Sequence, residues 1–195
     1  MQNILTSRMT KSGLYDFSLQ SALRIVLFIT FTAISGQLAV YLPYTPVPVT
    51  MQTLFVVLAG IVLGPRDGFC AMAGYVALGL SGAPVFAGFA FGPAVLLGPT
   101  GGFLIAFPAG ALIAGWINSQ MREGILSAAL SAAAGISVIL AIGTASLALM
   151  AGISIKQSAS LAVLPFIPGE VVKIAMAAII IRPGSSFRRT GMWKQ

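Results

Sequence analysis

Apolar residues along this chain fall into six runs, which Gly, Pro and charged residues separate. The approximate bounds of the runs are 20–42, 50–63, 68–80, 100–117, 125–151 and 161–181. Such runs predict helices, so the expected fold class is all-α. The second and third runs are shorter than the roughly 20 residues that a helix needs to cross a bilayer. We therefore expect them to borrow flanking residues, or the turn at 64–67 to lie partly within the membrane face.

The composition indicates which solvent these runs face. Of the 195 residues, 57% are hydrophobic and 8% are charged, and the mean hydropathy is +0.97. A soluble domain carries roughly 25% charged residues, so this chain has too little charge to cover a surface in water. We expect its excess apolar surface to contact membrane lipid. The prediction is a single domain over residues 1–195, an integral membrane bundle of six transmembrane helices in the cell membrane.

The basic residues predict how this bundle is oriented. Eleven Lys and Arg outnumber four Asp and Glu, for a formal charge of +7. Six crossings put both termini on one side, and the positive-inside rule makes that side cytoplasmic. Nine basic residues then lie inside: Arg8, Lys11, Arg24, Arg66, Arg122, Arg182, Arg188, Arg189 and Lys194. Lys156 alone lies in an outer loop. Charge that flanks the apolar runs in this way argues against a nucleic-acid partner.

The available residue types exclude several kinds of chemistry. The chain has one Cys, Cys70, and no His, so it offers no disulfide framework, no Cys/His metal site and no Cys–His dyad. It has no GxxxxGK[ST] motif, so energy from ATP must come from partner subunits. We therefore expect no enzyme activity, no metal and no cofactor.

The connections expected on the outside predict a pocket. They are residues 43–49, 81–99 and 152–160. The first two are rich in Pro, Gly and aromatic residues, and such broken backbone must be buried in protein or line a wet cavity. Short turns explain the Pro and Gly of any one loop about equally well. The second connection, however, is longer than the ~2–8 residues of a helix hairpin. It predicts a lid or pocket wall that includes Phe86, Gly88 and Phe89.

One ionisable pair lies inside an apolar run. Glu170 and Lys173 are three residues apart, so they share a face of a helix. An ionisable residue in a membrane span costs roughly 2.5–3.5 kcal/mol on insertion scales and usually faces protein or water. Pro168 and Gly169 interrupt the run just before it, which predicts a helix start beside Glu170, as in the broken helices of transporters. The alternative is a self-contained salt bridge of little energetic weight.

Three uncharged residues are further candidates for the pocket. Gln52 has no capping role at the start of its run, so its side chain is available to the pocket. Tyr75 is either an interfacial aromatic residue or a stacking wall. Gly101 opens the fourth run in a glycine-rich segment, which lets helices or a ligand approach the backbone closely.

Small residues recur four positions apart on the first run. Thr32 pairs in this way with Gly36, and Ser35 with Ala39. The spacing is typical of close helix contacts in membranes. It predicts a docking surface for another membrane subunit, and packing within the chain explains it about as well.

Five segments, in this order, resemble those of the BioY family: PVPVTMQTL, LGPRDG, GAPVFAG, LGPTGG followed by FP, and FIPGEVVK. BioY proteins are the biotin-specific S components, or substrate-binding membrane subunits, of energy-coupling factor (ECF) transporters. The resemblance runs from about residue 20 to residue 182. It implies a six-helix membrane protein that binds biotin with high affinity from the outside and delivers it inward. The implied partners are a transmembrane coupling subunit and cytoplasmic ATPase subunits, which supply the energy.

The chemistry of biotin suits the candidate residues. Its ureido ring has a carbonyl acceptor and a pair of N–H donors, which Lys173 and Glu170 can satisfy together. Alternatively, Lys173 contacts the carboxylate of the ligand. The bicyclic body and aliphatic tail of biotin suit Tyr75, Phe86 and Phe89.

Two other functions stay open at this point. An S component for another vitamin, such as thiamine or riboflavin, would keep the fold, and cationic thiamine would suit Glu170 but not Lys173. A proton-coupled small-molecule exporter would use Glu170 as its titrating carboxylate.

Overall fold

The computed structural model describes residues 19–181 of the chain. Six of the basic residues used to predict the orientation lie outside the described residues: Arg8, Lys11, Arg182, Arg188, Arg189 and Lys194. The side of the membrane on which they lie stays a prediction.

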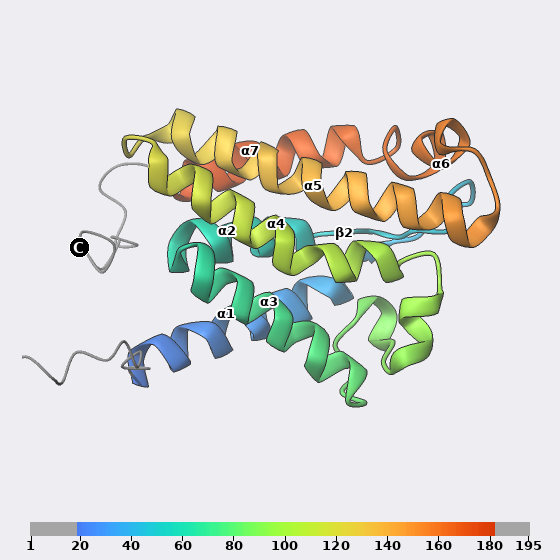
Figure 1. Cartoon of the computed structure of the whole chain (residues 1–195), viewed down its shortest axis with the longest axis horizontal. Coiled ribbons are helices and arrows are strands. Elements are labelled where there is room, and N and C mark those ends of the chain that lie inside the picture. Colours follow the sequence, from blue (N-terminus) through green and yellow to red (C-terminus); the bar gives the residue numbers. More distant parts are fainter. Residues whose placement is uncertain (1–18, 182–195) are drawn as a thin grey trace, which may run out of the picture.

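The described chain is mostly helical, as predicted, with one short two-stranded ribbon (Figure 1). In chain order its elements are α1 (Leu19–Gln37), β1 (Ala39–Val40), β2 (Val49–Thr50), α2 (Gln52–Leu63), α3 (Pro65–Leu80), the 3-10 helices η1 (Ala87–Phe89) and η2 (Pro93–Leu97), α4 (Gly101–Gln120), α5 (Ile125–Ala151), α6 (Ile155–Ala162) and α7 (Ile167–Ile180). The ribbon is antiparallel, with Ala39 opposite Thr50.

Several helix ends differ from their predicted positions. The first helix ends at Gln37 and not at residue 42, because the residues that follow leave it to pair with β2. The third begins at Pro65, so Gly64 alone, with a φ of 89°, separates α2 from α3. Proline is tolerated at a first helical position, where its missing N–H has no partner in any case. The fourth helix continues to Gln120. The predicted range 125–151 agrees with α5.

The stretch 152–160, which we expected to be an outer loop, contains most of a helix. α6 begins after Ser154, whose side chain accepts a hydrogen bond from the backbone N–H of Gln157, while the side chain of Gln157 accepts one from the backbone of Ser154. This capping box pairs N–H groups that the first turn would otherwise leave without partners. The expectation of a loop there was wrong because the capping box stabilises a helix start within a polar segment.

The predicted helix 161–181 is broken. α6 ends at Ala162, α7 begins at Ile167, and the two helices are bent by 59°. Pro168 lies in the first turn of α7, where a proline fits, whereas a continuous helix would lose a hydrogen bond at this position. The break places a helix start directly before Glu170.

Three helices of the described region are long and apolar enough to cross a membrane, namely α1, α4 and α5. The bent pair of α6 and α7 counts as a fourth span if it is taken together. α2 is apolar but has 12 residues, about 18 Å of helix, against a hydrocarbon core of roughly 30 Å. The chain is thus a helical membrane protein with several apolar spans, and six crossings stay a prediction.

α2 lies in the middle of the bundle. Nine of its 12 residues are buried, and it contacts α1, α3, α4, α5 and α7. Gly60 permits the close approach to α4, because a Cβ at this position would overlap the carbonyl oxygen of Ala111. Gly115 of α4 packs in the same way against the backbone of Gly60 and Pro65. Backbone-to-backbone contact of this kind requires glycine.

The long connections gather at one end of the bundle. In Figure 1 the start of α1 and the end of α7 lie toward the left, as do the α2–α3 and α4–α5 connections. The ribbon, η1, η2 and the turn from α5 into α6 lie toward the right. Both described ends of the chain therefore lie at one end of the long axis, and the segments predicted to form a pocket lie at the other.

Gly60→Ala is expected to destabilise the bundle, because the added methyl group meets backbone of α4 rather than a movable side chain. Overpacking of this kind costs about 1–3 kcal/mol. Gly124→Ala is the matched control, since a Cβ there meets nothing within 4 Å and the backbone is extended. Thermal unfolding in detergent measures both variants. Equal melting temperatures would contradict the proposed contact.

Candidate functional site

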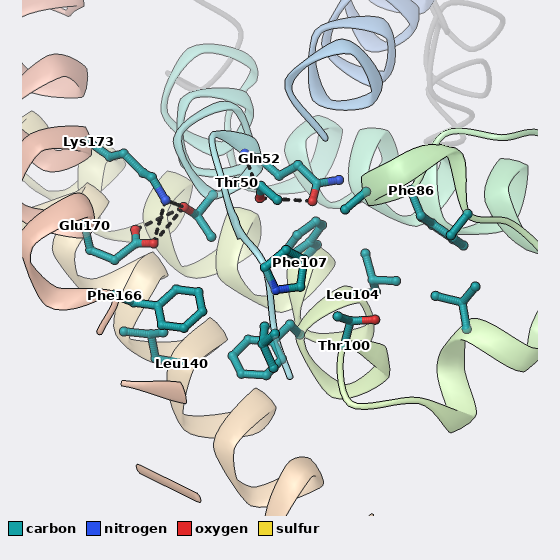
Figure 2. Close-up of a pocket in the computed structure, with 17 residues that line it drawn as sticks. Thr50, Gln52, Phe86, Thr100, Leu104, Phe107, Leu140, Phe166, Glu170 and Lys173 are labelled. Atoms are coloured by element: carbon teal, nitrogen blue, oxygen red, sulfur yellow. Dashed lines mark hydrogen bonds and ion pairs between the residues drawn. The ribbon is translucent and has the colours of Figure 1, made fainter. Parts of the chain in front are cut away.

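A cavity opens at the end of the bundle where the long connections gather. Its lining residues come from the segment before α2, from α2, from the η1–η2 region and from α4, α5 and α7. They are Val47, Pro48, Thr50, Gln52, Thr53, Phe86, Ala87, Ala90, Val95, Thr100, Phe103, Leu104, Phe107, Leu140, Phe166, Glu170 and Lys173. Figure 2 shows Lys173 and Glu170 on one side of this cavity and Phe86 on the opposite side. The wall is mostly apolar, with a few polar groups, which is typical of small-molecule sites.

A buried ion pair supplies the charges of this wall. Nζ of Lys173 lies 2.7 Å from Oε1 of Glu170, and the two residues are 2% and 4% exposed. Thr53 of α2 joins both, since its hydroxyl accepts from Nζ of Lys173 at 2.9 Å and donates to Oε2 of Glu170 at 3.0 Å. Ions removed from water need such partners, because each loses several kcal/mol of hydration. Among the described residues, no group of three or more His, Cys, Asp or Glu is placed to hold a metal ion.

The local sequence explains how the pair is held. Glu170 lies in the first turn of α7, where the positive end of the helix dipole favours a carboxylate. Lys173 follows three residues later on the same face. The predicted helix start beside Glu170 and the predicted shared face are both confirmed.

A chain of hydrogen bonds runs along another part of the wall. The hydroxyl of Thr50 donates to Oε1 of Gln52 at 3.1 Å, and the side-chain nitrogen of Gln52 donates to the hydroxyl of Tyr75. That hydroxyl donates in turn to the backbone carbonyl of Val85 at 2.9 Å. Burial requires such pairing of polar atoms. The chain of bonds therefore connects α2 and α3 to the segment before η1.

Four of the residues predicted for the pocket line the cavity: Glu170, Lys173, Gln52 and Phe86. Tyr75 lies behind the wall and is fully buried, which excludes the interfacial interpretation. Its ring stacks on Phe107, a lining residue, with the ring centroids 6.1 Å apart. Tyr75 thus supports the wall from behind.

Gly88, Phe89 and Gly101 lie outside the cavity lining. Gly88 and Phe89 belong to η1, whose flanking residues do line it, and Phe89 is 65% exposed. Gly101 is buried, and a Cβ at this position would overlap the carbonyl of Leu96. The close approach predicted for this glycine occurs between two backbone segments, and a contact of these three residues with a ligand stays a prediction.

Three of the four predicted docking residues lie on α1 and pack inside the bundle. Thr32 and Ser35 are 0% and 2% exposed, and a Cβ on Gly36 would crowd the Gln52 amide. Ala39 pairs with Thr50 in the ribbon. Packing within the chain accounts for this spacing, since side chains buried in this way do not reach the surface of a partner. Docking through them stays a prediction that the observed packing disfavours.

The sequence pattern did not predict Thr53 as the partner of both charges, nor Phe103 and Phe107 as lining residues of the cavity. Thr53 lies 117 positions from Glu170, and its place beside Gln52 at a helix start was the only signal. Phe103 and Phe107 are four residues apart and so share a face of α4. In an apolar helix, however, this spacing does not distinguish a cavity wall from a face toward lipid.

Comparison with known proteins identifies the family. The model of the BioY family matches residues 7–190. This chain belongs to the BioY family. "Probable biotin transporter BioY" of Pyrococcus horikoshii is 44% identical to it over 156 residues, which are 80% of this chain and 90% of that protein. "Biotin transporter BioY" of Thermotoga maritima is 39% identical over 71% of this chain and 81% of that protein.

A solved structure supports the same assignment. It is described as the S-component for biotin from an ECF-type ABC transporter, and it matches this BioY chain with a TM-score of 0.76 at 26% identity. The match covers 84% of this chain and 89% of that chain. Because the family is one of membrane transporters, the expectation that this chain is a multi-helix transport protein and not an enzyme is confirmed.

Glu170→Gln and Lys173→Met are each expected to destabilise the protein, because each leaves a buried ion without its counter-ion, at a cost of about 3–5 kcal/mol. The double variant removes both charges and should lose less stability than the sum of the single losses. Thermal unfolding of the four proteins in detergent measures this. Lys156→Met, at an exposed lysine, is the control. Strictly additive losses would mean that the two charges do not interact.

Proposed function

We propose that this BioY protein is a high-affinity biotin-binding membrane subunit that mediates biotin uptake. The observation that carries the proposal is the buried cluster of Lys173, Glu170 and Thr53 in the wall of a mostly apolar cavity. The relatives named as biotin transporters and the solved S-component for biotin support the choice of ligand.

The cluster suits the ureido ring of biotin, which has an acceptor carbonyl beside a pair of N–H donors. Burying such a ring without partners costs several kcal/mol. The ammonium of Lys173 has three N–H groups, and Glu170 and Thr53 accept from it, which leaves one for the ureido carbonyl. The carboxylate of Glu170 has lone pairs left for a ureido N–H. A donor and an acceptor thus stand side by side, as the ureido edge requires.

Contact between Lys173 and the carboxylate of biotin is the alternative, and the geometry disfavours it. Oε1 of Glu170 lies 2.7 Å from Nζ of Lys173, so a second carboxylate at Nζ would lie close to the first, and like charges repel. We assign the ureido ring to this cluster. The bicyclic body and the aliphatic tail fit the apolar wall that includes Phe103, Phe107 and Phe166.

We infer the topology and the location from the arrangement of elements. The proposal is six crossings of the cell membrane with both termini cytoplasmic. Arg24, Arg66 and Arg122 belong to elements or connections at the same end of the bundle as the described chain ends, and Lys156 belongs to α6 at the opposite end (Figure 1). This asymmetry agrees with the positive-inside rule. The surroundings proposed for the bundle are membrane lipid, with no nucleic-acid partner.

We propose that the energy for uptake comes from a transmembrane coupling subunit with cytoplasmic ATPase subunits. The solved neighbour comes from an ECF-type ABC transporter, which supports partners of this kind.

Two rival functions are less well supported. An S component for thiamine would place a cationic ligand beside the buried ammonium of Lys173, and the relatives reported above are named for biotin and not for thiamine or riboflavin. A proton-coupled exporter would use Glu170 as its titrating carboxylate, whereas the relatives reported above are named as biotin transporters.

Lys173→Ala is expected to weaken biotin binding by roughly 10- to 100-fold or more, because a charge-assisted hydrogen bond to the ligand is lost and Glu170 stays unpaired. Lys156→Ala removes an exposed lysine from α6 and should bind like the wild type. Equilibrium binding of radiolabelled biotin to purified protein in detergent measures both, after gel filtration has shown that each variant is folded. Undiminished affinity in a folded Lys173→Ala protein would remove the basis of the proposal.

A panel of competing ligands is expected to show which part of biotin the cluster contacts. Biotinamide keeps the ureido ring but has no carboxylate, so it should compete within about tenfold of biotin if Lys173 and Glu170 contact the ring. Thiamine and riboflavin should not compete. Failure of biotinamide to compete with biotin would favour a contact between Lys173 and the carboxylate. Displacement of biotin by thiamine or riboflavin would favour another vitamin as the ligand.

A further inference from the structure

Residues 85–90, which we call the lid segment, close one side of the cavity. Phe86, Ala87 and Ala90 line the cavity, and Phe86 is 1% exposed. The segment forms a small closed loop, since the N–H of Phe86 donates to the carbonyl of Ala90 at 3.1 Å. What holds this loop in place therefore shapes the cavity.

Gln37, the last residue of α1, holds the lid segment with its side-chain amide. Its nitrogen donates to the carbonyl of Phe86 at 3.1 Å and to the carbonyl of Ala33 at 3.3 Å. Its oxygen accepts from the N–H of Phe89 at 3.0 Å. An amide group has two N–H donors, and here one is anchored on α1 while the other bonds the lid. Gln37 thus fastens both a carbonyl and an N–H of the lid to a membrane helix.

The backbone conformation of the lid segment needs such hydrogen bonds to hold it. Gly88 and Phe89 have φ angles of 67° and 60°, and a positive φ is uncommon for a residue with a side chain. A conformation of this kind persists when its surroundings fix it. Phe89 is 65% exposed, so packing of its side chain contributes little, and the hydrogen bond from its N–H to Gln37 fixes this conformation together with the backbone bonds within the loop.

A second set of hydrogen bonds connects the lid segment to the polar wall. The carbonyl of Val85 accepts from Tyr75, which in turn accepts from Gln52, a lining residue. Gly36 lies beneath this junction, where a Cβ would crowd both the Gln52 amide and the Val85 carbonyl. The end of α1 therefore supports the lid at two consecutive residues, Gly36 and Gln37.

We propose that Gln37 is a latch that keeps the lid segment closed and thereby sets how slowly the bound ligand leaves. The inference rests on the proposed function for the identity of the ligand. Gln37 does not line the cavity, so it is a positioning residue that acts through Phe86 and Phe89. Its removal changes the dissociation rate more than the association rate, because the bonds it makes hold the closed state.

Gln37→Ala is tested in the full chain in detergent against Gln120→Ala, which removes an exposed glutamine at the end of α4. The loss of two lid hydrogen bonds should speed the dissociation of radiolabelled biotin about tenfold, with melting temperature and association rate little changed. Gln120→Ala should match the wild type. A folded Gln37→Ala protein with an unchanged dissociation rate would overturn the latch.

A measurement without ligand separates the latch from the proposed function. In a Cys70→Ala background, which removes the native cysteine, Ala90→Cys places a thiol on the half-buried lining face of the lid. Adding Gln37→Ala should speed maleimide labelling of that thiol, and unchanged labelling would overturn the latch even if the wild type bound no biotin.

If Gln37→Ala does not fold, Gln37→Glu replaces it. This variant keeps the acceptor for Phe89 but sets a carboxylate against the Phe86 carbonyl, so it should also speed labelling, and unchanged labelling would again count against the proposal.

Discussion

The rest of this structure depends on the need to pair two charges inside an apolar bundle. Lys173 and Glu170 satisfy each other at 2.7 Å, and Thr53 bonds to both. Because membrane lipid cannot solvate an ion, α2 and α7 must meet at the level of these side chains. The break before α7 serves the same requirement, since it places a helix start beside the carboxylate.

α2 meets this requirement because it is short and central. It contacts five other helices of the described chain, and Gly60 lets its backbone lie directly against α4. Its first turn then faces the cavity with Gln52 and Thr53. One helix end therefore carries a partner for the ion pair as well as the amide that leads through Tyr75 to the lid segment. Close glycine packing in the middle of the bundle and polar chemistry at its end are two consequences of the same helix position.

The site consists of residues that line the cavity and residues that hold the lining. Tyr75 and Gly79 do not reach the cavity, yet Phe86 packs edge-to-face on the ring of Tyr75, and a Cβ on Gly79 would overlap the ring of Phe86. In this BioY protein the lining therefore carries the polar groups of the proposed site, and the layer behind it holds the shape of the cavity. Membership in the family follows from the match over residues 7–190, whereas this division of roles is visible only in the contacts.

The sequence by itself determined what depends on composition and on neighbours along the chain. Hydropathy predicted a helical membrane protein, and three-residue spacing predicted that Glu170 and Lys173 share a helix face. Only the tertiary structure decided that Thr53, 117 positions from Glu170, completes their cluster, and that Thr32, Ser35 and Gly36 face inward. The physical reason is that helix formation and i,i+3 pairing act over one turn, whereas the choice of which apolar face meets which helix is a property of the packed bundle. In a chain whose helices are apolar on most sides, hydrophobic periodicity does not record that choice.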